Sequence, residues 1–222
     1  MESNLVITED GSASIFIPEL DEHYHSVHGA LQESMHVFID AGLKNKINQT
    51  DSVDILEIGF GTGLNALLTC IIADENKSSV IYTAIEKYPL SKALISELNY
   101  CNLIDTTNCL ERFSLIHTCD WEEEVEISNY FKLKKYKSDI ADVAFIQQFD
   151  IIYFDAFAPS AQPELWTESI FSSMFKALKN RGILVTYCAK GIVKRTMKQS
   201  GFIVEALPGP KGKREMTRAI KP

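Results

Sequence analysis

Strand-like and helix-like runs alternate between Val53 and Ser200, and this alternation is the strongest constraint on the fold. Apolar strand-like runs span 53–58, 80–86, 113–118, 149–155 and 182–188, and helix-like runs lie at about 64–73, 91–100, 163–179 and 191–200. Apolar strands without clean alternation, separated by helices, predict an α/β fold with a mostly parallel sheet covered on both faces. Two further strand-like runs, 201–209 and 214–221, flank a Pro/Gly/Lys loop and predict a C-terminal antiparallel hairpin.

The first 48 residues have a different pattern. Residues 4–20 alternate around Asp10-Gly11, which predicts a hairpin, and a helix is expected from Ala30 to Leu43. These elements are too short for a core of their own. We therefore expect a small N-terminal extension at 1–48 and a Rossmann-like domain at 49–222. Within that domain, the charged stretch 121–148 predicts a helix and a variable surface segment.

Composition narrows the class of protein. A chain of 222 residues that is 45% hydrophobic is long enough for one full core. Its longest apolar runs are about half the ~20 residues of a membrane span, and its acidic start lacks the pattern of a signal peptide, so a cytoplasmic protein without a membrane partner is expected. The five cysteines are widely spaced without a CxxC motif, which predicts reduced thiols, and the histidines predict no metal site.

A glycine-rich turn follows the strand-like run 53–58. In open parallel sheets, ligands bind beyond the carboxyl ends of the strands. Gly59, Gly61 and Gly63 follow a GxGxG spacing, which differs from the GxGxxG of dinucleotide sites. Glu57 would repel a pyrophosphate but suits the cationic aminopropyl end of S-adenosylmethionine, and Glu86 can bind ribose hydroxyls. The alternative, that the glycines only allow close packing, stays open.

Acidic residues also follow the third and fourth strand-like runs. Asp120 can accept a hydrogen bond from an adenine amino group, with Trp121 available for stacking, although Asp120 could equally cap a helix. Asp155 ends the run 149–155, where a methyl acceptor would meet the donor, and Phe157 can present an aromatic face. Because an amine acceptor must be neutral, a carboxylate beside it can orient it and receive its proton. Asp155 could instead only cap the following loop.

The charge distribution is uneven along the chain. The net charge is −8, yet residues 176–222 hold 12 of the 22 Lys/Arg and only two of the 30 Asp/Glu. Such an asymmetry is typical of a phosphate-contacting face, although a merely solvated basic surface would look the same.

Several longer segments resemble the methyltransferase part of the MnmC family, which makes 5-methylaminomethyl-2-thiouridine at the wobble position of tRNA. The most specific are "FDAFAPSAQPELWT" (154–167) and "GKREM" (212–216). The others are the glycine turn, "EKYPLSKA" (86–93), "GILVTYCAKGIVKRTMKQSGF" (182–202) and "YHSVHGALQESMHVFI" (24–39). The similarity covers roughly residues 24–216.

The resemblance implies a class I methyltransferase fold, S-adenosyl-L-methionine as donor, and the amine of 5-aminomethyl-(2-thio)uridine as acceptor. With the residues argued above, it implies a catalytic pair of Asp155 and Phe157. The expected donor site comprises Tyr24, Ser26, Glu33, Glu57, Gly59, Phe60, Gly61, Gly63, Asn65, Glu86, Lys87, Asp120 and Trp121. The expected tRNA surface comprises Lys190, Lys194, Arg195, Lys211, Lys213 and Arg214.

Many members of that family carry a fused flavin-dependent oxidoreductase. This chain has no matching segment, so we expect it to receive 5-aminomethyluridine on tRNA from an upstream enzyme. Two alternatives stay open: a small-molecule amine methyltransferase or aminopropyltransferase of the same fold, and a non-catalytic nucleotide-binding interaction protein.

Overall fold

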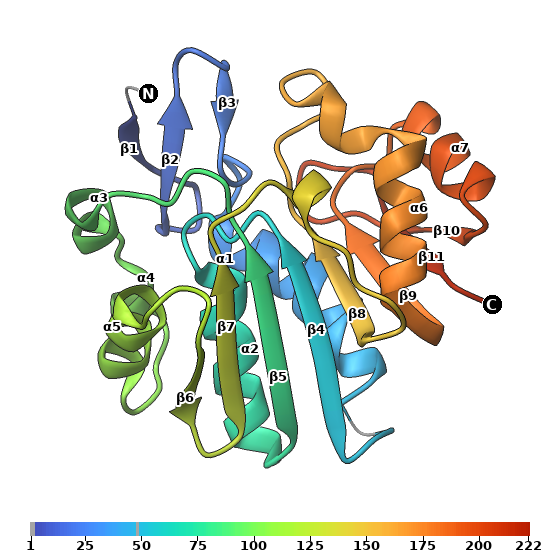
Figure 1. The fold of residues 1–222 in the computed structure, drawn as a ribbon. Coiled ribbons are helices and arrows are strands. Elements are labelled where there is room, and N and C mark those ends of the chain that lie inside the picture. The colour runs from blue at the N-terminus through green and yellow to red at the C-terminus, as the bar shows by residue number, and fades with distance from the viewer. Residues whose placement is uncertain (1–2, 48) are drawn as a thin grey trace.

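An eight-stranded sheet runs through the computed structural model of the chain, which describes residues 3–47 and 49–222 (Figure 1). The neighbouring strands are, in order, β10 (Ile203–Pro208), β11 (Glu215–Ile220), β9 (Leu178–Thr186), β8 (Phe149–Phe154), β4 (Ser52–Ile58), β5 (Ser79–Ile85), β7 (Phe131–Tyr136) and β6 (Glu124–Ser128). The five strands from β9 to β7 are parallel, and β6, β10 and β11 are antiparallel to their neighbours. The predicted mostly parallel sheet and its C-terminal hairpin are confirmed.

Both faces of the sheet carry a hydrophobic core. Along β8, Ile151 and Tyr153 face one core, and Ile152 and Phe154 face the other, as the two-residue period of a strand requires. Helix α2 (Leu64–Asn76) packs in the first core, while α6 (Glu168–Ala177) and α7 (Gly191–Gln199) pack in the second (Figure 1). Strand order reverses at β4, which pairs with β5 on one side and β8 on the other. That reversal predicts a ligand site at the carboxyl end of β4.

The N-terminal segment forms a small sheet of its own above the arrowheads of the large one (Figure 1). Strands β1 (Asn4–Ile7) and β2 (Ala13–Ile17) form the expected hairpin, and β3 (Glu22–His23) adds a third strand. The expected helix begins at Ala30 as α1 (Ala30–Ser34) and continues as a π-helix, Met35–Asp40, before a 3-10 turn at Leu43–Asn45. The predicted domain boundary at Asn48 lies outside the described residues.

The assignment of the third strand was wrong. Residues 113–118 belong to helix α5 (Cys109–Thr118), whose buried side chains Cys109, Phe113 and Ile116 recur at helical spacing. The third parallel strand is β7, within the stretch predicted to contain a helix. Its inward positions are Phe131, Leu133 and Lys135. Lys135 is buried because its Nζ donates to the carbonyl oxygens of Ile116 (2.8 Å) and His117 (3.3 Å), and this lysine conceals the strand pattern.

The prediction of five reduced cysteines was also wrong in part. Cys101 and Cys109 form a disulfide, with Cα atoms 5.5 Å apart. The bond joins α4 (Tyr100–Leu103) to the start of α5, after the short helix α3 (Lys92–Glu97). The turn between α4 and α5 brings the two residues together, and their sequence spacing gave no sign of it. Within the described residues, no helix is long and apolar enough to cross a membrane.

Candidate functional site

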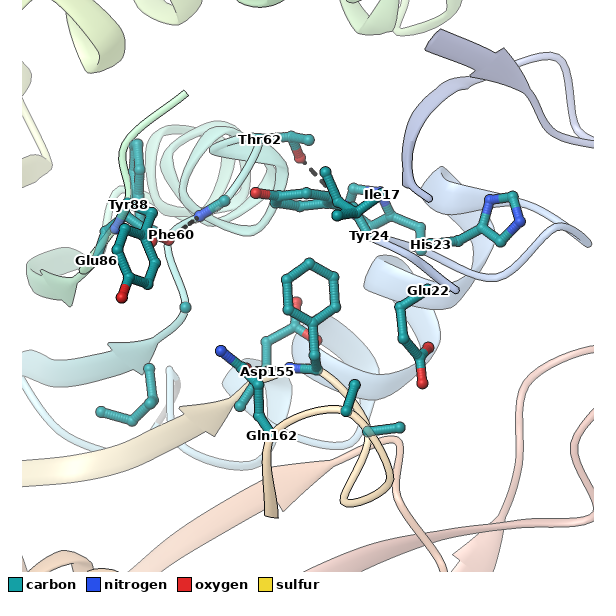
Figure 2. A pocket seen from close by; sticks show the side chains of 18 of the residues that line it. Ile17, Glu22, His23, Tyr24, Phe60, Thr62, Glu86, Tyr88, Asp155 and Gln162 are labelled. Atoms are coloured by element: carbon teal, nitrogen blue, oxygen red, sulfur yellow. Dashed lines mark hydrogen bonds between the residues drawn. The ribbon is translucent and has the colours of Figure 1, made fainter. Parts of the chain in front are cut away.

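A cavity of about 990 Å³ lies at the carboxyl ends of β4, β5 and β8. Its walls come from the N-terminal segment 22–28, the glycine turn, the loops after β5, β7 and β8, and the C-terminal hairpin loop. Figure 2 shows Tyr24 in the upper part of the pocket and Asp155 in the lower part, with Glu86 on the left and Glu22 on the right. The cavity is therefore built from segments far apart in the sequence.

The glycine turn brings the backbone close to two other walls of the cavity. Gly59 has φ +88°, and a Cβ there would stand 2.6 Å from the carbonyl oxygen of Asp155. A Cβ on Gly61 would stand 3.0 Å from Cδ1 of Tyr24. A side chain at either position would meet backbone or an aromatic ring, so these glycines let the turn approach β8 and the N-terminal segment closely.

Asn65, in the first turn of α2, links two carboxyl groups. Its Nδ2 donates to Oε1 of Glu57 and to Oδ2 of Asp155, each at 2.9 Å. Burial raises the pKa of Asp155 to about 7, and the nearby Glu33 carboxylate adds to the rise. Burial also holds the pKa of Glu57 well above its usual range. Glu57 is fully buried and does not line the cavity, so its influence on a ligand passes through Asn65.

Glu86 follows β5 and is held by the backbone. Its Oε2 accepts from the amide of Gly61 (3.0 Å), and its Oε1 accepts from the amide of Tyr88 (2.8 Å). The next residue, Lys87, forms an ion pair with Asp139 at 2.8 Å. Each Glu86 oxygen keeps a second lone pair, so the carboxylate is positioned to accept hydrogen bonds from hydroxyl groups in the cavity.

The loop after β8 is braced from several directions. The amide of Phe157 donates to Oε1 of Gln162 (3.1 Å), and its carbonyl accepts from the indole nitrogen of Trp166 (2.8 Å), in the 3-10 turn Pro163–Trp166. The hydroxyl of Tyr187 donates to the carbonyl of Ala156 at 2.9 Å. The Phe157 ring meets the Tyr24 ring edge to face, with centroids 4.9 Å apart. Asp155 and Phe157 thus sit on a rigid loop.

The N-terminal segment 22–28, which covers the cavity, is hydrogen-bonded to the glycine turn. His25 is buried between Oγ of Ser14 and Oγ1 of Thr62, each 3.3 Å from a ring nitrogen. Burial lowers the pKa of His25 to about 4, so the ring is neutral near pH 7. Glu33 accepts from the amide of Ser26 at 2.7 Å and forms a short ion pair with Lys213.

Most of the predicted donor and acceptor residues line this one cavity. They are Tyr24, Ser26, Glu33, Gly59, Phe60, Gly61, Asn65, Glu86, Lys87, Asp155 and Phe157. Gly63 and Glu57 lie behind the lining, in the turn and the strand.

The predicted adenine contacts, Asp120 and Trp121, do not line the cavity. They follow helix α5 and not a strand, and Trp121 packs over Nζ of Lys135, 4.9 Å from the ring centroid. The acidic residue that follows the third strand is Asp139, which lines the cavity beside Ile140. Sequence reasoning missed Asp139 because the run 131–136 was not recognised as a strand.

The six predicted tRNA-contacting residues divide into two groups. Lys194 pairs with Glu215 (2.7 Å), Lys211 pairs with Glu9 (3.0 Å), and Lys213 pairs with Glu33 inside the cavity. The other three are exposed and form no ion pair with the described part of the chain: Lys190, Arg195 and Arg214. Lys213 is therefore placed to act on the cavity.

The cavity wall carries an excess of negative charge. Six carboxylates line it, with two lysines: Glu22, Glu33, Glu86, Asp139, Asp155, Glu164, Lys87 and Lys213. Both lysines are already paired with two of those carboxylates. The remaining negative charge favours a cationic ligand or substrate.

Comparisons with known proteins agree with this geometry. Residues 107–222 match the model of a family described as S-adenosyl-L-methionine-dependent methyltransferase. The chain is 29% identical over 211 residues to the tRNA 5-methylaminomethyl-2-thiouridine biosynthesis bifunctional protein MnmC of Leptospira borgpetersenii, covering 88% of this chain and 32% of that protein. It is also 29% identical over 234 residues to the protein of that name from Burkholderia mallei, covering 96% of this chain and 34% of the relative.

Solved structures give the same picture. The structure of MNMC2 from Aquifex aeolicus matches with a TM-score of 0.81 at 26% identity, covering 98% of this chain and 69% of that one. Spermidine synthase from Thermotoga maritima matches with a TM-score of 0.55 at 13% identity, over 100% of this chain and 72% of that one, and shows a shared fold alone. The chain spans about a third of the length of the curated relatives it matches. The predicted class I methyltransferase fold and the predicted resemblance to the MnmC family are confirmed.

Proposed function

The chain belongs to the family of S-adenosyl-L-methionine-dependent methyltransferases, and we propose that it methylates the primary amine of 5-aminomethyl-(2-thio)uridine at the wobble position of tRNA. The observation that carries the proposal is Asp155: a carboxyl with a pKa raised to about 7, on a braced loop in an acidic cavity. The names of the MnmC relatives support the choice of a tRNA uridine as substrate.

S-adenosyl-L-methionine is the cofactor, and the residues at the glycine turn fit it. Oδ1 of Asn65 is buried and has no hydrogen-bond partner among the described residues, so it can accept from the ammonium of the aminopropyl end. Glu86 would accept from the ribose hydroxyls, and Asp139 with Ile140 would contact the adenine. The glycine backbone leaves room for the ligand to approach. When bound, the cofactor supplies a methyl group activated by its sulfonium centre.

Asp155 would orient the acceptor amine and accept its proton. Only a neutral amine offers the lone pair that would form the new carbon–nitrogen bond as the carbon–sulfur bond of the donor breaks. The donor would leave as a neutral thioether, and the methylated nitrogen would be an ammonium that must lose a proton to become a neutral amine. Asn65 occupies Oδ2 of Asp155, which leaves Oδ1 to orient the amine and accept that proton. A pKa near 7 suits both steps. Tyr24 and Phe157 would flank the substrate and exclude water.

The substrate must already carry its amine, so the reaction depends on an upstream enzyme that installs the aminomethyl group on tRNA. Docking of the tRNA would use the exposed Lys190, Arg195 and Arg214, since the other three predicted cations have carboxylate partners. We expect the logarithm of tRNA affinity to fall with the logarithm of salt with a slope of about −3, against about −5 if all six cations contacted phosphate.

A second candidate is methylation of a free polyamine-like substrate. The excess of carboxylates in the cavity favours it, because polyamines are cationic. The exposed cations near the C-terminal loop argue for tRNA, since a small cationic substrate would be repelled by them.

Mass spectrometry of nucleosides tests the proposal. Unmethylated tRNA bearing 5-aminomethyl-2-thiouridine, incubated with the protein and S-adenosyl-L-methionine, should gain one methyl on that nucleoside. Asp155→Asn should abolish the gain while leaving donor binding within about threefold, because a neutral amide can still accept from Asn65. Methylation of a free polyamine with none on the tRNA would refute the proposal and support the second candidate.

A further inference from the structure

An ion pair between a half-buried lysine and a buried glutamate joins the N-terminal helix to the C-terminal loop at the edge of the cavity. Nζ of Lys213 pairs closely with Oε1 of Glu33, and the two side chains are 33% and 8% exposed. The other Glu33 oxygen accepts from the amide of Ser26. The Lys213 ammonium also lies over the ring of Tyr187, 4.1 Å from its centroid. Both charges are therefore fixed in place.

The neighbouring contacts direct Lys213 inward. A Cβ on Gly212 would stand 2.1 Å from the ring of His28, so the loop lies against the segment that covers the cavity. Lys211, on the other side of Gly212, is anchored to Glu9. With the loop held at both points, Lys213 faces the cavity and Glu33, and a bound phosphate would have to compete with the Glu33 carboxylate for it.

The two charges act in opposite directions on Asp155. The Glu33 carboxylate raises the pKa of Asp155, and the Lys213 ammonium lowers it. Tyr187 connects the pair to the acceptor loop, because its ring lies under Lys213 and its hydroxyl holds the carbonyl of Ala156.

Other titratable groups face this cluster from every neighbouring element. His25 and Cys188 interact electrostatically with Lys213, and Glu57 faces Asp155 through Asn65. The Tyr187 hydroxyl and Cys188 thiol have raised pKa values because they are buried, and burial keeps His25 neutral near pH 7. The charges of Glu22, Lys190 and Lys194 also act on Tyr187 or Cys188. On Asp155 itself, Glu33 and Lys213 act with opposite signs.

We propose that Lys213 is a positioning residue whose charge balances Glu33, so that the Asp155 carboxyl is ionised when the acceptor amine arrives. The inference rests on the proposed function for its catalytic meaning. Removing Lys213 alone would leave the Glu33 carboxylate uncompensated beside Asp155, and a buried unpaired charge acts strongly on its neighbours. Asp155 would then hold its proton to higher pH and could not accept one from the amine.

A double-mutant cycle on the pH profile of kcat tests this role. In Lys213→Met the acidic limb should move up by about one pH unit, a roughly tenfold loss of rate below the midpoint, and in Glu33→Gln it should move down. The double variant removes both charges and should return the limb to within about 0.3 unit of the wild type. Lys213→Arg should keep the wild-type profile. Lys132→Met, which removes an exposed lysine paired with Glu124 on β6, is the matched control.

The ionisation of Asp155 can also be followed by protein stability, without an activity assay. The difference in unfolding free energy between each protein and its Asp155→Asn counterpart changes with pH through the titration of Asp155. The midpoint of this pH dependence should move to higher pH in Lys213→Met and return to the wild-type value in the double variant. This measurement decides the inference even if the wild type transfers no methyl group to tRNA, a result that would refute the proposed function by itself.

Two outcomes would overturn the inference. In one, the double variant has the same loss of rate as Lys213→Met, and the stability difference titrates with the same midpoint in all variants. The ion pair then only holds the loop. In the other, Lys213→Met raises KM for tRNA and weakens its salt dependence while the pH profile stays unchanged, and Lys213 is a phosphate contact.

Discussion

Replacing Asp155 by asparagine should remove activity and yet stabilise the fold above neutral pH. The Asp155 carboxyl has its pKa raised from 3.8 to about 7, mainly by burial. A carboxyl of this kind binds its proton more tightly in the folded chain than in the unfolded one. The wild type therefore loses stability as pH rises from about 4 to about 7, where the folded state gives up that proton. Asparagine has no such proton and can still accept from Asn65.

The size of the effect follows from the shift. At 1.36 kcal/mol per pKa unit, a rise from 3.8 to about 7 corresponds to an upper limit of about 4 kcal/mol. Asp155 keeps some contact with solvent in the cavity, so we expect Asp155→Asn to gain about 2 kcal/mol at pH 8. At pH 4 the difference should approach zero, because aspartic acid is then neutral as well.

Urea unfolding followed by circular dichroism at several pH values from 4 to 8 measures this difference. Subtracting the wild-type curve cancels most of the contribution of other groups, including Glu57. Asp51→Asn, at an exposed position before β4, is the control and should give a difference near zero throughout. A variant that is less stable than the wild type at pH 8, or a difference that does not change with pH, would refute the reasoning.

Three other changes test the cavity and its supports. Gly59→Ala should lower the free energy of unfolding by about 3 kcal/mol in urea titrations, because φ is +88° and the Cβ would meet a backbone oxygen at 2.6 Å. In calorimetry, Asp139→Ala should weaken S-adenosyl-L-methionine binding about tenfold, while Asp120→Ala should change it less than twofold; the reverse order would restore Asp120 to the donor site. Reduction of the Cys101–Cys109 disulfide should lower stability by about 2–3 kcal/mol, as expected for a short closed loop, and equal urea midpoints with and without dithiothreitol would contradict this.

The sequence correctly predicted the elements whose formation depends on neighbouring residues. β4, the glycine turn and α2 follow one another directly, and an apolar strand, a glycine turn and an apolar helix each leave a recognisable pattern. β7 left no such pattern, because one of its three inward positions is Lys135. That lysine is buried only because carbonyl oxygens at the end of α5 accept its protons, a long-range contact that no periodicity reveals.

The residues of the candidate site also fall into those that the sequence could place and those that it could not. Asp155, Phe157, Gly59 and Glu86 could be placed together because the carboxyl ends of parallel strands meet at one edge of the sheet. The pairing of Glu33 with Lys213 could not be predicted, since 180 residues separate them. Asp139 was missed as a direct consequence of the missed strand, because the rule that selects it counts strands from the glycine turn.

The structure partly explains why the C-terminal region is basic and the rest of the chain acidic. Three of the six cations assigned to a tRNA surface, Lys194, Lys211 and Lys213, are paired with carboxylates. Two of these pairs connect the C-terminal loop to the N-terminal segment, so part of the basic C-terminal region serves to close the cavity. Meanwhile six of the carboxylates that make the chain acidic line that cavity. The exposed cations that we propose to contact tRNA thus lie outside a cavity with a negatively charged lining, although the chain as a whole has a net charge of −8.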